Sequence, residues 1–295
     1  MVEWVNLPGV EVQLRSEESV MQNSYQYKPF KYFFITLFVT WIFLFAAAFY
    51  SYTEGLESYQ RPVMLPALLA PFIIAILMIY GSKNSELKKD FKTRLFDLKL
   101  IKLQYWPAIL LIMPFALFLA TAISLLFGQP FEQFSLSPEF THFGGEVFMI
   151  LVILFLAPTF EELGWRGYGV DSLKKGNSLM KATLIFALLW NLWHVPLFFI
   201  KDYYQNELIH MNIIYALNFV VSLIPAAILM NWIFYKNGRS IISIIVFHSM
   251  LNLFSVLFQT EQFTKCIITI ILFIISGIVV WRNKSFFYDS TSDIE

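Results

Sequence analysis

The chain has 295 residues, of which 58% are hydrophobic and only 14% are charged. A soluble domain carries about 25% charged residues, so water does not surround most of this chain. Lys and Arg total 21 and Asp and Glu total 21, which removes a bulk electrostatic reason to bind nucleic acid. The single cysteine, Cys266, excludes an internal disulfide framework and any metal site built from several cysteines.

Long apolar runs dominate the sequence. Each of eight runs is long enough to cross about 30 Å of hydrocarbon at about 1.5 Å per residue. We expect spans near Tyr32–Tyr50, Val63–Tyr80, Trp106–Phe127, Val147–Trp165, Ala182–Ile200, Ile213–Tyr235, Ile241–Gln259 and Cys266–Trp281. The pattern therefore predicts an all-α, polytopic membrane protein with about eight transmembrane helices.

The basic residues are distributed unevenly between the two sides of these spans. With the N-terminus inside, the inner segments hold 18 of the 21 Lys and Arg residues. The outer segments hold only Arg61, Lys201 and Lys265. Because Lys and Arg accumulate in cytoplasmic loops, this distribution predicts that both termini lie in the cytoplasm and that the protein is multi-pass in the cell membrane.

The polar segments indicate one membrane-embedded domain with two tails. Residues 1–30 contain four glutamates and lack an early apolar core, so they do not resemble a cleavable signal peptide. The inner segment 81–105 mixes basic and acidic residues, which is typical of an interfacial amphipathic helix held by anionic lipids. Without internal repeats, the sequence predicts a single domain over 31–285 and cytoplasmic tails over 1–30 and 286–295.

Strongly polar side chains at membrane depth are few, and three of the predicted spans carry most of them. A charged side chain near the centre of a membrane helix costs about 2.5 to 3.5 kcal/mol on insertion scales, so such residues are site candidates by default. The candidates are Glu161, Glu162 and Arg166 in the fourth span, Trp190, Asn191, His194 and Pro196 in the fifth, and His248 and Asn252 in the seventh. The sixth span adds Asn218 and Asn231.

The spacing of the two glutamates distinguishes them. Glu162 and Arg166 are four residues apart with the acid first, the favourable orientation for an ion pair on a helix, whereas Glu161 points about 100° away. A carboxylate in a poorly hydrated site can serve as a general base near neutral pH. Taken alone, the same residues also fit a structural ion pair with an acid that extends toward the cytoplasmic surface.

The two histidines have partners at helical spacing. His248 and Asn252 are four residues apart, so both project from one face and can donate hydrogen bonds toward one point, as an oxyanion requires. Pro196 lacks a backbone N–H, so it deprives the Leu192 carbonyl of its helical donor and predicts a local break at His194. A membrane histidine on its own is as often an interhelical hydrogen-bonding residue as a catalyst.

Together, these residues resemble three motifs of the CPBP family of intramembrane proteases. That family includes the CAAX prenyl endopeptidases of the Rce1 type and bacteriocin-immunity relatives. Its Glu-Glu-x-x-x-Arg motif matches Glu161, Glu162 and Arg166, which Gly167 follows; its aromatic-x-x-x-His motif matches Trp190 and His194; and its His-x-x-x-Asn motif matches His248 and Asn252. The matches occur in order within a motif core of residues 146–260, and the only departure is Trp190 where Phe is more usual.

The resemblance implies an endopeptidase that cleaves a membrane-associated protein or peptide near the cytoplasmic face. In the roles carried over from the family, Glu161 activates water with help from His194, while His248 and Asn252 stabilise the oxyanion. Glu162, Arg166 and Trp190 support the site. The expected partners are membrane lipids and the peptide or membrane-protein substrate, with no nucleic acid.

A metal ion is the alternative to water activated by glutamate alone. Glu161, His194 and His248 would form a ligand set of two histidines and one glutamate, as in catalytic zinc sites. We favour no cofactor because the contiguous His-Glu-x-x-His motif of classical zinc peptidases is absent. His142 and His210 fall in outer loops and are expected to be solvated.

Two other classes of protein compete with the peptidase interpretation. A non-catalytic immunity or assembly factor could keep the same fold and bind a partner, but binding alone does not require Glu161, His194, His248 and Asn252 together. A transporter would also carry polar groups at depth. Transporters often contain internal repeats, and none is visible here.

Overall fold

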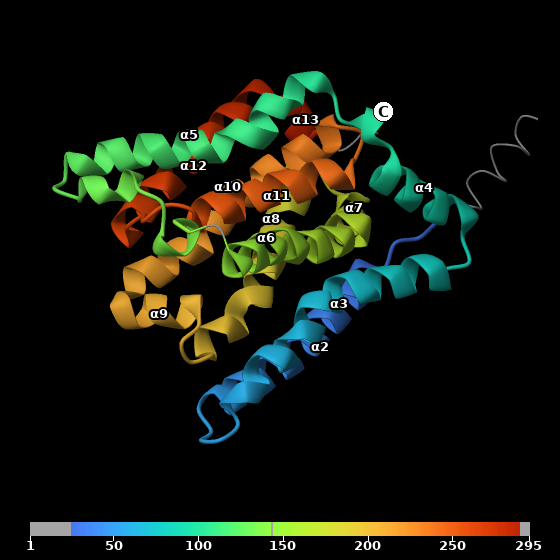
Figure 1. The fold of residues 1–295 in the computed structure, drawn as a ribbon. Coiled ribbons are helices and arrows are strands. Elements are labelled where there is room, and N and C mark those ends of the chain that lie inside the picture. The colour runs from blue at the N-terminus through green and yellow to red at the C-terminus, as the bar shows by residue number, and fades with distance from the viewer. Residues whose placement is uncertain (1–24, 143, 290–295) are drawn as a thin grey trace, which may run out of the picture.

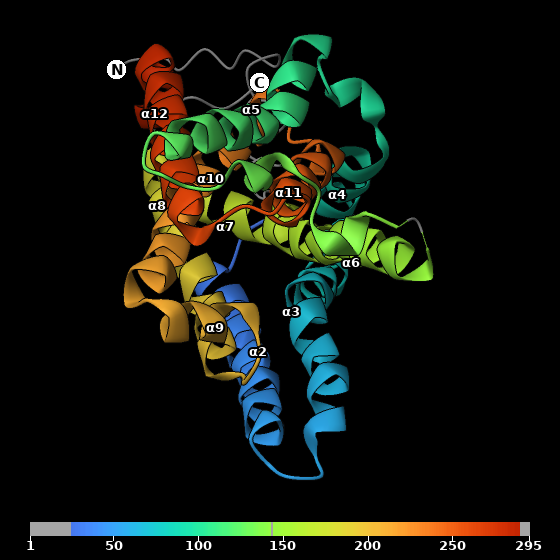
Figure 2. The same cartoon turned by 60° about the vertical axis from the view of Figure 1, so that its left-hand side comes forward.

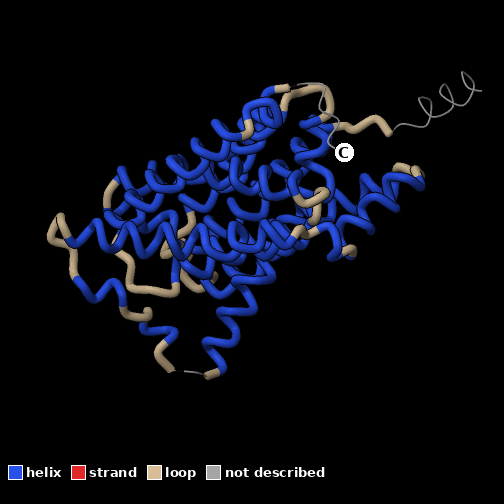
Figure 3. Tube along the Cα trace, turned by 90° about the horizontal axis from the view of Figure 1, so that it is seen from above, coloured by secondary structure: helices blue, strands red, loops and turns tan. Residues whose placement is uncertain are grey.

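The computed structural model describes residues 25–142 and 144–289. Most of the two predicted tails, 1–30 and 286–295, lies outside these residues. The described chain is helical and contains no β-strand, and its single isolated bridge pairs Leu136 with Phe258 (Figure 3). The predicted all-α class is confirmed.

Seven helical segments of the described chain are long and apolar enough to cross a membrane, which confirms a polytopic membrane protein. They are built on α2 (Pro29–Ser51), α3 (Gln60–Gly81), α5 (Trp106–Leu125), α6 (Gly145–Gly164), α8 (Leu179–His194), α10 (Ile213–Lys236) and α12 (Gln262–Arg282). The predicted seventh span, Ile241–Gln259, is shorter than expected. Its helix, α11 (Ile241–Val256), has 16 residues and a length of about 24 Å, less than the thickness of a bilayer core.

Four shorter helices complete the described chain. α4 (Ser85–Phe96) and α9 (Tyr204–Met211) connect long segments, α7 (Val170–Lys174) ends the segment that begins with α6, and α13 (Lys284–Tyr288) follows α12. Single turns are η1 (Glu57–Tyr59), η2 (Leu98–Leu100), η3 (Leu103–Tyr105), η4 (Phe131–Phe134), η5 (Pro138–Phe140), η6 (Trp165–Gly169) and η7 (Val195–Phe199).

The long helices pack in a closed sequence of neighbours. α2 and α3 form an antiparallel hairpin whose loop projects from the bundle (Figure 2). α3 packs on α6, α6 on α11, α11 on α5, α5 on α12, α12 on α10 and α10 on α8, while α2 contacts both α3 and α8. α11 also contacts α10, and the three motif-bearing helices α6, α8 and α11 lie near the centre of the view in Figure 1.

Local sequence signals fix where the motif-bearing helices begin. The side chain of Ser178 accepts a hydrogen bond from the backbone of Lys181 and so caps α8. Ser240 caps α11 in the same way through the backbone N–H of Ser243. Such caps satisfy backbone donors that have no partner within the helix, which stabilises the start by about 1 kcal/mol.

The bundle has two distinct ends, and both described ends of the chain lie at the same one. The Tyr25 carbonyl oxygen accepts a hydrogen bond from Lys175, directly after α7, and α13 packs on α8 and contacts Lys236 at the end of α10. α4 lies at this end too, because its Arg94 pairs with Asp171 of α7. α9 and the start of α12 lie at the opposite end of α10, a helix of 24 residues (Figure 1).

Candidate functional site

The helix that carries both glutamates is longer than predicted. α6 does not end at Trp165 but continues through η6, a π-helical turn, into α7 and ends at Lys174. A Cβ on Gly164 would lie 2.4 Å from the Pro71 carbonyl carbon, so only glycine lets α3 pack this closely. The longer helix places Glu161 about 20 Å from Lys174, deeper than a helix ending at Trp165 allows.

Glu162 is fully buried and has two partners of opposite charge. Arg166 Nη1 lies 2.5 Å from Glu162 Oε2, which confirms the predicted pair four residues apart. His248 Nδ1 lies 2.8 Å from the other oxygen of the same carboxylate. Arg166 also donates to Asn231 Oδ1 at 3.2 Å, and Asn231 donates in turn to Thr183. Glu162 therefore connects α6 to α11, and Arg166 connects it to α10.

Glu161 has a different environment from Glu162. It is also buried, and Trp190 Nε1 donates a hydrogen bond to its Oε2 at 3.1 Å. No Lys or Arg forms an ion pair with Glu161 among the described residues. The Trp190 ring lies edge-on to both histidines, with its centroid 5.7 Å from that of His194 and 5.6 Å from that of His248. One indole thus brings Glu161 together with both predicted histidines.

The predicted break at His194 is present. α8 ends at His194, and Pro196 lies in the first turn of η7. The Leu192 carbonyl, which Pro196 leaves without its helical donor, accepts a hydrogen bond from Trp41 Nε1 at 2.9 Å. The end of α8 is therefore fixed to α2, so the position of His194 depends on both helices.

Hydrogen bonding at Nδ1 determines which nitrogen each histidine presents to the site. His194 Nδ1 lies 2.8 Å from the Trp190 carbonyl oxygen, which only accepts, so this nitrogen carries the proton. His248 Nδ1 donates to the Glu162 carboxylate for the same reason. Each ring therefore keeps its Nε2 for other partners.

A cavity of about 210 Å³ begins at these histidines. Trp190, His194, His248 and Asn252 line it, so His248 and Asn252 share one face as their spacing predicts. Glu161 does not line the cavity itself and reaches its wall through Trp190. Four of the seven predicted site residues therefore lie on one cavity, and the other three lie behind it.

The cavity extends toward the end of the bundle that holds α9. Its far lining includes Tyr204 of α9 and Gln262 and Lys265 at the start of α12. Both described ends of the chain lie at the opposite end of the bundle, next to α7. The sequence predicted cytoplasmic termini and a site that faces the cytoplasm. The described ends of the chain and the far end of this cavity lie at opposite ends of the bundle.

The donor set for a metal ion is not assembled. Among the described residues, no three His, Cys, Asp or Glu side chains gather closely enough to hold a metal ion. Glu161 bonds the Trp190 indole, while His248 bonds Glu162. His142 and His210 are exposed, as predicted. The arrangement of these described side chains does not fit a three-ligand metal site.

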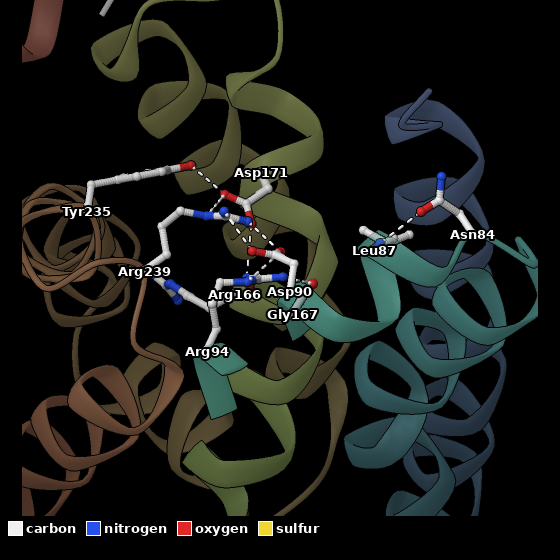
Figure 4. A network of polar contacts seen from close by, with 9 residues as sticks. All are labelled: Asn84, Leu87, Asp90, Arg94, Arg166, Gly167, Asp171, Tyr235 and Arg239. Atoms are coloured by element: carbon white, nitrogen blue, oxygen red, sulfur yellow. Dashed lines mark hydrogen bonds and ion pairs between the residues drawn. The ribbon is translucent and has the colours of Figure 1, made fainter. Parts of the chain in front are cut away.

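Arg94 of α4 is fully buried, although nothing in the sequence pattern predicts this. The amphipathic pattern of segment 81–105 predicted an interfacial helix, yet Arg94 points into the protein (Figure 4). Its guanidinium donates to the carbonyl oxygens of Arg166 at 2.7 Å and Gly167 at 3.1 Å. Arg94 thus satisfies carbonyls of the π-helical turn that directly follows the glutamates.

Four charged residues join α4 to this turn. Asp90 and Asp171 each pair with both Arg94 and Arg239, at distances between 2.8 and 3.0 Å (Figure 4). Tyr235 donates a further hydrogen bond to Asp171 at 3.0 Å. Burial opposes the charge on Arg239, but the Asp171 and Asp90 carboxylates outweigh it and raise the pKa of this guanidinium. The cluster connects α4, α7 and the turn before α11.

Comparison with known proteins identifies the family. The family model for the type II CAAX prenyl endopeptidase Rce1-like proteins matches residues 143–254, close to the predicted motif core. The chain is also 43% identical to CAAX prenyl protease 2 of Methanococcus maripaludis over 269 residues, or 91% of this chain and 99% of the relative. The chain belongs to the Rce1-like family. It is therefore a membrane-embedded peptidase, as the three motifs predicted.

Family membership favours a peptidase over the immunity-factor and transporter alternatives. It also accounts for the polar residues of α6, α8 and α11, since the matched region contains all three motifs. Two contributors to this Rce1-like site were not assigned a role from the sequence. Asn231 was noted only as a polar residue within a predicted span. The burial of Arg94 could not be predicted because its segment is rich in charged residues.

Proposed function

We propose that the chain hydrolyses a peptide bond of a membrane-associated protein or peptide with water activated by Glu161 and His194. The observation that carries this proposal is the Trp190 indole, which bonds Glu161 and contacts both histidine rings at one end of a cavity. The name of the archaeal relative supports substrates that end in a C-a-a-X motif, whose cysteine carries a prenyl group.

Glu161 is the general base of the proposed reaction. It accepts a proton from water while the unprotonated Nε2 of His194 orients that water, and the resulting hydroxide adds to the scissile carbonyl. The carboxyl group then delivers the same proton to the departing amine as the carbon–nitrogen bond breaks. Glu161 suits this role because Trp190 holds it in place and no Lys or Arg is ion-paired with it among the described residues.

His248 and Asn252 stabilise the oxyanion of the tetrahedral intermediate in this scheme. Both line the cavity from one face of α11. The Asn252 side chain supplies an amide N–H, and His248 donates from Nε2 when its ring carries two protons. The Glu162 carboxylate at Nδ1 is a suitable partner for such a charged ring, and this contact also fixes its orientation.

Substitution of Glu161 in the purified full-length protein tests this mechanism. With a farnesylated C-a-a-X peptide as the substrate, we expect Glu161→Gln to lower kcat by a factor of about 10² to 10⁴, the usual contribution of a general base. Asn252→Ala should lower kcat by a factor of about 10² to 10³, as the loss of an oxyanion donor does in soluble hydrolases. Glu146→Gln is the matched control because Glu146 is exposed on the same helix. Wild-type cleavage rates in both site variants would exclude these roles.

Treatment with a chelator tests the proposal that no metal ion takes part. Because Glu161 and the two histidines do not converge as ligands, we expect cleavage to be unchanged after chelation and dialysis. Loss of activity on chelation that zinc restores would instead support the ligand set of two histidines and one glutamate.

We propose that the substrate reaches the cavity from the cytoplasm, on the strength of the resemblance between the motifs and those of the family. This proposal requires the α9 end of the bundle to be cytoplasmic, although the distribution of Lys and Arg supports the opposite orientation. The test is to introduce Gln262→Cys or Lys99→Cys into a Cys266→Ser background and label each from one side with an impermeant maleimide. We expect Gln262→Cys to react from the cytoplasmic side and Lys99→Cys from the other. The reverse result would exclude cytoplasmic access through this cavity.

A further inference from the structure

One feature of the cavity is not used by the proposed mechanism, namely a single basic residue at its far end. Among the described residues, Lys265 is the only Lys or Arg that lines the cavity, and no Asp or Glu lines it. The Lys265 ammonium lies 5.0 Å from the centre of the Tyr204 ring and 3.4 Å from its hydroxyl oxygen. No ion pair of Lys265 with a carboxylate is present among the described residues.

The backbone around Lys265 is held in place by a buried glutamine. Gln133, only 1% exposed, accepts hydrogen bonds from the Glu261 backbone at 3.0 Å and from Thr264 Oγ1 at 2.6 Å. Its amide donates to Ser124 Oγ at 3.2 Å, which fixes the start of α12 to the end of α5. The cation is thus carried on a fixed helix start rather than on a loop.

An ammonium without an acidic partner among the described residues, in a cavity that no carboxylate lines, is suited to bind an anion. We propose that Lys265 binds the C-terminal carboxylate of the peptide substrate, with the scissile bond at the His194 and His248 end. This inference rests on the proposed function. A C-a-a-X motif ends three residues after its cysteine, and three extended residues span about 10 Å. When the bond after the cysteine is cut, the C-terminal carboxylate therefore lies within about 10 Å of the reacting carbonyl. Lys265 would then favour substrates cut close to their C-terminus.

The test compares one farnesylated C-a-a-X peptide as the free acid and as the C-terminal amide. A hydrogen bond to a charged group contributes about 1.5 to 3 kcal/mol, which corresponds to about a 10- to 100-fold change in binding. We therefore expect the wild-type KM to be about 10- to 100-fold higher for the amide, with little change in kcat. Lys265→Met should raise the KM of the acid to that of the amide, and Lys265→Arg should restore most of the preference.

Lys201→Met is the matched control because Lys201 is an exposed lysine that does not line the cavity. It should keep the wild-type preference for the acid. An unchanged preference in Lys265→Met, or no preference in the wild type, would overturn the role of Lys265 while cleavage itself continued. If the wild type cleaved neither peptide, the proposed function would fail, and the role of Lys265 would fail with it.

Discussion

Two clusters of charge lie near each other along the same helical segment, one buried and one partly exposed, and their charges are balanced differently. The α4 cluster consists of Asp90, Arg94, Asp171 and Arg239. It contains two acids and two permanent cations, and each acid contacts both guanidinium groups. The site cluster consists of Glu161, Glu162, Arg166 and His248, with two acids and one permanent cation.

In the proposed mechanism, this difference separates a cluster that stabilises the fold from one that also takes part in the reaction. In the site cluster, Glu162 alone contacts both Arg166 and His248, so Glu161 is left with an indole N–H. A buried carboxylate without a cationic partner is costly, and such groups concentrate at functional sites. The α4 cluster has no such residue, which fits its place outside the cavity lining. Substitutions in the two clusters should therefore affect activity and stability differently.

The largest combined effect on stability and activity is expected from Glu162→Gln. Removing this carboxylate leaves Arg166, which is fully buried, with the Asn231 side chain and without an ionic partner. It also weakens the contact that orients His248. Breaking a buried ion pair costs about 3 to 5 kcal/mol of stability, and we expect the upper end of that range because no second acid of the described chain pairs with Arg166.

The measurements are the apparent Tm of the purified protein in detergent and kcat on the farnesylated peptide. Both should fall in Glu162→Gln, whereas the exposed Glu146→Gln should change neither. A Glu162→Gln protein with the stability and activity of the wild type would show that the site cluster does not depend on this carboxylate.

Asp171→Asn should have a smaller effect, confined to stability. Arg94 and Arg239 each keep Asp90 as a partner after the substitution. We therefore expect the free energy of unfolding to fall by about 3 kcal/mol, the lower end of the range for a broken buried ion pair. The kcat of the protein that remains folded should stay close to that of the wild type, since Asp171 does not line the cavity. Thermal unfolding and kcat of the same preparation check this, with the exposed Asp202→Asn as the control. A loss of kcat without a loss of stability would contradict the division between the clusters.

Features set by local spacing could be predicted from the sequence. The Glu162–Arg166 pair follows from a separation of four residues, and the end of α8 at His194 follows from Pro196. The shared cavity face of His248 and Asn252 has the same origin. Each of these depends on helical geometry within two turns, which the sequence determines directly.

Features that depend on packing between distant segments could not be predicted. The contact between His248 and Glu162 joins residues 86 positions apart. The continuation of the helix past Gly164 depends on the π-helical turn that Arg94 supports from another helix, while two glycines in that turn favour a break by their low helix propensity. Which end of the bundle the cavity reaches likewise follows from how α9, α10 and α12 pack together.

The smallest effect is expected from Trp190→Phe, which tests the single hydrogen bond to Glu161. Phenylalanine keeps the aromatic packing against Phe186 and the histidine rings but removes the donor to Glu161 Oε2. We expect kcat to fall about tenfold, the lower end for a hydrogen bond to a charged group, with little change in stability.

Trp232→Phe is the matched control for this change. The Trp232 indole N–H is buried and has no hydrogen-bond partner among the described residues, so the same substitution there removes no such bond. Its kcat should equal that of the wild type. Equal rates in Trp190→Phe and Trp232→Phe would show that Glu161 is positioned without the indole. The difference between Glu161 and Glu162 would then depend only on the ionic partners of Glu162.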